Sequence, residues 1–81
     1  MQETINGMRQ SLAEKIKPMR KAAYGDITDE NAREAVAALN TAETWYAYAL
    51  NNKRRMKVFY GRGQFELAEK NFWKTIRGGA E

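Results

Sequence analysis

The sequence predicts an all-α protein, a small bundle of three main helices. Apolar residues recur at intervals of three and four rather than two, as on one face of a helix. Glycine and proline fall in few places, and neither occurs between Gly25 and Gly61. The 81 residues form one domain, residues 1–81. This is near the size at which one core supplies only about 3 to 5 kcal/mol, so self-association or a partner would add useful burial.

The first helix is expected at about residues 2–24. Its apolar stripe consists of Ile5, Met8, Leu12, Ile16 and Met19. Pro18 disturbs the backbone of this helix, because it lacks an N–H to donate and its ring crowds the carbonyl of Glu14. The helix therefore either stops near Lys17 or kinks at Pro18 and continues to Tyr24.

The second helix is expected at about residues 28–60, and its start carries the clearest signals in the chain. Gly25 can adopt the left-handed conformation that ends a helix, and Thr28 is a favourable N-cap. Asp29 follows in the first turn, where the helix dipole favours negative charge. The only weak point before the next glycine is Asn51 with its asparagine neighbour, where the helix can break.

A turn at Gly61, Arg62 and Gly63 is expected to lead into a third helix at about residues 64–77. The apolar stripe of this helix consists of Phe65, Ala68, Phe72 and Ile76, and Gly78 ends it. On its polar side, Glu66 and Lys70 are four residues apart and form a favourable pair.

The net charge of +4 is concentrated in one segment, because residues 53–62 contain five cations and no acidic residue. Phosphate binding needs cations, and base stacking needs flat side chains nearby. The candidate binding residues are Lys53, Arg54, Arg55, Lys57, Tyr60 and Arg62. Two other interpretations stay open. The cations can stabilise the C-terminal end of the long helix, with the apolar residues in the core, or they can meet an acidic protein surface or an anionic membrane.

The middle of the long helix is apolar around more than one face, and must be covered on more than one face. Packing against both neighbouring helices is one explanation. The other is an interface with another subunit or a target protein, for which the aromatic candidates are Trp45, Tyr46, Tyr48 and Trp73. Alanines on this helix allow close approach of another helix, and we expect a homodimer through the central helix.

Several classes of site are excluded by composition. The chain contains neither His nor Cys, so the usual zinc, haem and iron–sulfur ligand sets and any disulfide are missing. Two carboxylate pairs occur at helical spacing. Glu30 with Glu34 is better explained as a solvated helix face, and Glu66 with Glu69 as ion-pair partners of Lys70 and Arg62. Neither a phosphate loop nor a helix-turn-helix fits the glycines. We therefore expect no enzyme activity, no cofactor and no metal.

The location expected from the sequence is the cytoplasm. No signal peptide is evident, and the longest uncharged stretch, Thr44–Asn52, is far shorter than the ~20 residues that span a bilayer.

The sequence is most consistent with a small, non-catalytic accessory or regulatory protein from a bacterium or phage. The first hypothesis is binding of DNA or RNA through residues 53–62 at the end of the long central helix. The alternative is an adaptor or inhibitor that docks on an acidic surface of a target protein. Its size and simplicity resemble those of small helical hairpin dimers that regulate nucleic-acid processes and of small phage-encoded inhibitors, a likeness of architecture alone.

Overall fold

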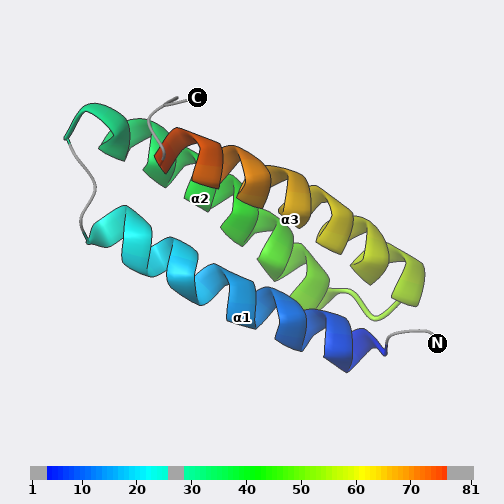
Figure 1. Ribbon diagram of the computed structural model, residues 1–81. Coiled ribbons are helices and arrows are strands. Elements are labelled where there is room, and N and C mark those ends of the chain that lie inside the picture. The colour runs from blue at the N-terminus through cyan, green and yellow to red at the C-terminus, as the bar shows by residue number, and fades with distance from the viewer. Residues whose placement is uncertain (1–3, 26–28, 77–81) are drawn as a thin grey trace.

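A computed structural model describes residues 4–25 and 29–76, with the side chains of residues 29–32 left out of the description. The described chain forms three helices and no strand: α1 (Ile5–Tyr24), α2 (Asp29–Asn51) and α3 (Arg55–Ile76). The predicted all-α fold of three main helices is confirmed (Figure 1).

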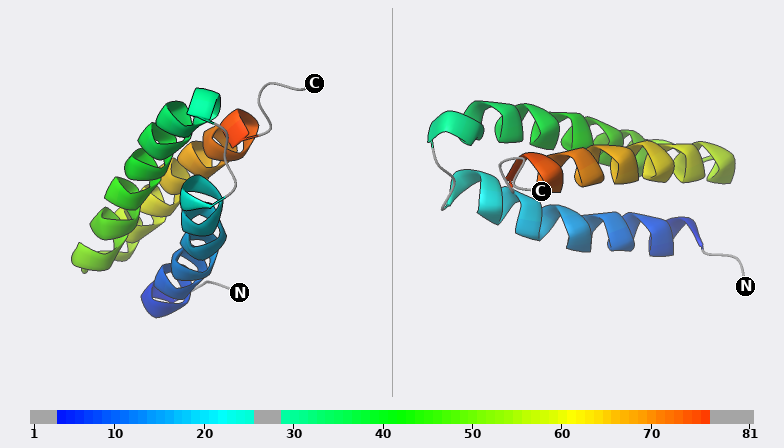
Figure 2. Two further views of the ribbon diagram at one scale, coloured as in Figure 1. Left: turned by 90° about the vertical axis from the view of Figure 1, so that its left-hand side faces the viewer. Right: turned by 45° about the horizontal axis from the view of Figure 1, so that its top comes forward.

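Helices α2 and α3 form an antiparallel hairpin, and α1 lies along it, antiparallel to α2 (Figure 1). The two further views show that α2 and α3 stay side by side along their length, with α1 set against the pair (Figure 2). The bundle is elongated, 39 × 22 × 16 Å. The connection between α2 and α3 therefore lies at one end of the molecule.

The core lies between the three helices and is made almost entirely of apolar side chains. From α1 and α3 come the predicted stripes, of which Met8, Leu12, Ile16, Met19, Phe65, Ala68 and Phe72 are buried. From α2 come Leu39 and the small residues Ala35, Ala38, Ala42 and Ala49, also buried. These alanines therefore allow α2 to pack closely against the other helices of the same chain.

Helix α1 begins at an N-cap, since the Thr4 hydroxyl accepts a hydrogen bond from the Gly7 N–H at 2.9 Å. It continues through Pro18 to Tyr24, so the predicted alternative of a stop near Lys17 is wrong. The expected left-handed conformation of Gly25 is wrong, because its φ is −106°. A Cβ there would lie 2.6 Å from the Lys21 carbonyl oxygen. Glycine is therefore required at this position because a side chain would clash with the last turn of α1. The predicted N-cap Thr28 lies outside the described residues.

The break near Asn51 occurs, and it moves the start of the last helix back to Arg55. The Asn52 side-chain Nδ2 donates to the Tyr48 carbonyl at 2.8 Å, which satisfies an end carbonyl of α2. The predicted turn at residues 61–63 is wrong, since both of its glycines are helical. A Cβ on Gly61 would lie 2.8 Å from Cδ1 of Tyr48, so Gly61 lets α3 pack closely on α2. That packing outweighs the roughly 1 kcal/mol cost of a helical glycine.

Ion pairs between described residues join α1 to the hairpin at exposed positions. Lys15 of α1 pairs with Glu66 of α3 at 3.3 Å, although the spacing in the sequence favoured Lys70 as the partner of Glu66. Arg20 of α1 forms a two-pronged contact with Glu43 of α2, at 3.1 and 2.6 Å. Both pairs keep α1 in register against the other two helices.

The Arg20–Glu43 pair leads us to expect a modest loss of stability in acid. The hydrogen bond from Arg20 lowers the pKa of Glu43, with burial acting in the opposite direction. A lowered folded-state pKa stabilises the fold at neutral pH, and this contribution is lost as the pH falls from about 4.3 through the folded-state pKa. The side chains are 46% and 33% exposed, so solvent screening keeps the contribution below about 1 kcal/mol.

Urea unfolding at neutral pH and at about pH 3 would measure this contribution, with Glu43→Gln as the variant. The variant should be slightly less stable than the wild type at neutral pH and should lose less stability on acidification. Equal losses of stability in the two proteins would contradict a role for this carboxylate.

Candidate functional site at the tip of the helical hairpin

The predicted basic segment lies at the connection between α2 and α3 and in the first turns of α3. We call residues 52–63 the hairpin tip. Lys53 and Arg54 lie in the connection, and Arg55, Lys57 and Arg62 lie on α3. The prediction that these cations end the long central helix is therefore wrong, because that helix stops at Asn51. They surround the N-terminal end of a helix, where the dipole is positive, and the interpretation that they stabilise a C-terminal end fails.

Helix α3 starts at a residue type that is a poor N-cap. Arg54 occupies the N-cap position, because its carbonyl accepts the backbone N–H of Val58 at 3.0 Å. An arginine side chain has no oxygen with which to accept an N–H of the first turn, and that turn contains no acidic residue. A positive charge at this end of a helix is unfavourable by on the order of 0.3 to 1 kcal/mol. The result is a local concentration of positive potential.

Three large apolar or aromatic side chains near these cations are exposed to solvent. Met56 is 85% exposed, Phe59 59% and Tyr60 53%. The Arg62 guanidinium lies over the Phe59 ring, 5.0 Å from its centroid. Phe59 was not among the predicted site residues, although it lies in the same segment as Tyr60. Once α3 is known to begin at Arg55, counting back from Phe65 by four and then by three residues places Gly61 and Val58 on the core stripe and leaves Phe59 outside it.

Tyr60 is held in an aromatic cluster that joins α3 to α2. Its ring centroid lies 5.6 Å from that of Trp45 and 6.3 Å from that of Tyr48, and Trp45 and Tyr48 are 5.3 Å apart, all edge to face. Such pairs stabilise by about 0.5 to 1.5 kcal/mol beyond area burial. Two aromatics expected at a protein interface thus support a residue of the basic segment.

The other two aromatics predicted for an interface lie away from the hairpin tip. Tyr46 and Trp73 are half-buried and pack against the core, with the Trp73 ring 5.0 Å from that of Phe72. Exposed positions on the described part of α2 carry mostly short or polar side chains: Arg33, Glu34, Ala37, Asn40, Thr41, Thr44, Ala47, Leu50 and Asn51. The homodimer through the central helix stays a prediction.

Arg9 fixes the hairpin tip from α1, and it was not among the predicted site residues. Its Nε donates to the Ala49 carbonyl at 3.0 Å, and its Nη2 donates to the Asn52 carbonyl at 2.6 Å. The last turn of α2 contains no basic residue, so Arg9 supplies the cation that favours this negative end. Forty or more residues separate the partners, and no local pattern indicates the contact.

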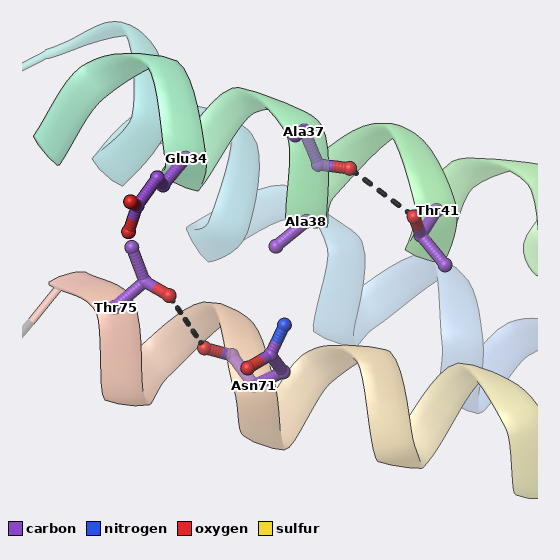
Figure 3. A pocket seen from close by; sticks show the side chains of 6 residues that line it. All are labelled: Glu34, Ala37, Ala38, Thr41, Asn71 and Thr75. Carbon is purple, nitrogen blue, oxygen red and sulfur yellow. Dashed lines mark hydrogen bonds between the residues drawn. The ribbon is translucent and has the colours of Figure 1, made fainter.

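A shallow groove of about 350 Å³ lies between α2 and α3, far from the hairpin tip, and is lined by Glu34, Ala37, Ala38, Thr41, Asn71 and Thr75 (Figure 3). The hydroxyls of Thr41 and Thr75 donate to carbonyls of their own helices, at 3.2 and 3.0 Å. Because both hydroxyl groups already donate to backbone carbonyls, the groove offers few free hydrogen-bond donors to a ligand.

The described residues contain no group of three or more acidic side chains that could hold a metal ion. Within the same part of the chain, no helix is long and apolar enough to cross a membrane. Comparison with protein-family models, curated proteins and solved structures finds no match for this chain. Its function is inferred from its surface, on which the hairpin tip combines charge with exposed aromatic rings.

Proposed function

We propose that this chain is a small non-catalytic accessory protein that binds nucleic acid through the hairpin tip. The observation that carries the proposal is the gathering of Lys53, Arg54, Arg55 and Lys57 at the positive end of α3, beside exposed aromatic rings. Cations release counterions from a phosphate backbone, and helix N-termini attract phosphate. Exposed rings offer stacking surfaces to bases.

The energetics of the free protein support an anionic partner. Cations at the N-terminal end of α3, with an arginine at the N-cap position and no acidic residue in the first turn, work against the helix that they begin. A phosphate bound there would reverse the sign of the interaction, because negative charge at this end is favourable. The hairpin tip is thus better suited to the bound state than to the free one.

An acidic protein surface is the second candidate partner, favoured by two exposed aliphatic side chains on α3. Met56 is 85% exposed and Leu67 63% exposed. Neither provides a flat ring for a base, whereas both could anchor a protein interface with the cations at its rim. Under this alternative, a partner captured from a host extract by the wild type would be lost with Leu67→Asp, and nucleic acid would not bind.

The nucleic-acid proposal is tested by fluorescence anisotropy with labelled mixed-sequence single-stranded and duplex DNA and RNA, between about 50 and 200 mM salt. Four phosphate contacts predict a log–log salt slope of about −3 on a single strand and slightly steeper on duplex DNA. The variant is Arg54→Ala with Arg55→Ala. Its control, Lys70→Ala with Lys74→Ala, removes the same charge from the other half of α3.

We expect the tip variant to lose affinity by at least about tenfold and to lower the salt slope by about 1 to 2, with little change in the control. Absence of binding at low salt would contradict the proposal. So would an equal loss of affinity in the tip variant and the control, since that would indicate attraction by net charge alone.

A further inference from the structure

Gly63 is a glycine inside a helix, and no contact with the described residues explains it. Glycine is one of the poorest helix formers, so a helical glycine calls for a reason in packing or function. Gly61 has such a reason in the close approach of Tyr48. A Cβ on Gly63 would meet nothing within 4 Å, so the space over this position is open.

The open space over Gly63 is bordered by two exposed aromatic residues. Phe59 and Tyr60 precede Gly63 by four and three residues, which makes both of them its neighbours on the helix surface. Their exposed fractions are 59% and 53%. One turn of α3 therefore presents two rings beside bare backbone, a surface on which a flat group can lie close to the helix.

Both rings are already held by contacts within the chain. Arg62 lies over the Phe59 ring at 5.0 Å, and the Tyr60 ring packs edge to face on Trp45 at 5.6 Å. Rings ordered before binding lose little conformational freedom when a ligand stacks on them.

The charge around the two rings suits a phosphodiester chain. Residues 53–65 contain five cations and no acidic residue. Glu66, the next residue in the chain, is paired with Lys15 of α1. A backbone phosphate can approach from the start of α3 while its base lies over Gly63.

We infer that the ligand is a single strand, and that an unpaired base stacks against Phe59 and Tyr60 in the space over Gly63. The inference rests on the proposed function and specifies which form of nucleic acid is bound. In a duplex the bases stack on each other and offer only their edges, so Phe59 and Tyr60 would stay in water. In a single strand the bases offer their faces, and each face can stack on an aromatic ring.

Anisotropy titrations compare a labelled oligothymidylate, a duplex of equal length and polyglutamate. The variants are Phe59→Leu, which keeps an apolar side chain but removes the ring, and Gly63→Leu, which fills the open space. Tyr24→Leu is the matched control, because it removes an exposed ring at the end of α1, at the opposite end of the bundle from the hairpin tip (Figure 1). Thermal unfolding accompanies each titration, and Gly63→Leu should raise the midpoint because leucine is a better helix former.

We expect the wild type to bind oligothymidylate roughly tenfold more tightly than the duplex. Phe59→Leu and Gly63→Leu should each weaken oligothymidylate binding by about five- to a hundredfold, with little effect on the duplex. Tyr24→Leu should bind like the wild type.

Equal affinity for both forms of DNA, unchanged in Phe59→Leu and Gly63→Leu, would overturn the stacking site and leave phosphate binding intact. Failure of both forms to bind would remove the proposed function itself. Polyglutamate binding as tightly as oligothymidylate, with no effect of Phe59→Leu, would overturn both in favour of an acidic protein partner.

Discussion

Replacing Arg54 with aspartate is expected to stabilise the free protein by about 1 kcal/mol and to weaken nucleic-acid binding tenfold or more. Arg54 occupies the N-cap of α3, where its carbonyl accepts the Val58 N–H. An aspartate there would accept a backbone N–H of the first turn and place negative charge at the positive end of the helix. The same carboxylate would repel the phosphates that we propose bind at this point.

Urea unfolding and anisotropy on the same samples would measure both effects. Arg54→Asn separates the two causes, because asparagine also caps a helix but carries no charge. It should stabilise the fold nearly as much as aspartate and weaken binding less. Arg54→Ala, with neither cap nor charge, should leave stability almost unchanged. An aspartate variant that binds as tightly as the wild type would exclude the start of α3 from the binding surface.

Replacing Arg9 with methionine is expected to destabilise the protein by about 2 kcal/mol. Methionine keeps an apolar stem but loses the donors that bind the Ala49 and Asn52 carbonyls. Those carbonyls lie at the negative end of α2, where charge-assisted hydrogen bonds contribute about 1.5 to 3 kcal/mol. The thermal midpoint should fall on the order of 10 °C in a protein of this size.

Arg20→Met is the matched control, since it removes an arginine from the same helix whose ion pair is exposed. Its expected cost is below about 1 kcal/mol. Arg9→Lys should fall between the two, because an ammonium keeps the charge but not the forked geometry. Equal destabilisation by Arg9→Met and Arg20→Met would show that the contacts of Arg9 add nothing beyond charge.

Periodicity predicted the helices and most of the core. The predicted stripes are buried from Met8 to Met19 and from Phe65 to Phe72, whereas Ile5 and Ile76 at their ends are only partly buried. Local chemistry was less reliable at the ends of helices. Pro18 did not end α1, and the glycines near residue 62 did not form a turn. In both cases packing along the whole helix outweighs a local cost of about 1 to 3 kcal/mol.

The residues of the candidate site were identified from composition, and the structure placed them at a different helix end from the one predicted. The cations of residues 53–62 were found from charge alone, but their relation to a helix end was reversed when α2 stopped at Asn51. Phe59 and Gly63 gained importance from the same shift, because the exposure of the Phe59 ring and the open space over Gly63 depend on where α3 begins. The predicted interface aromatics Trp45 and Tyr48 proved to be neighbours of Tyr60.

The sequence by itself determined the all-α class, the apolar stripes and the location of the positive charge, since spacing and residue type settle these locally. Only the tertiary structure decided which end of which helix the cations surround. It also decided that Gly61 is explained by Tyr48 while Gly63 faces open space, and that Arg9 caps a helix forty residues away. The physical reason is that each of these depends on contacts between helices distant in sequence, whose packing energy overrides the small preferences of single residues.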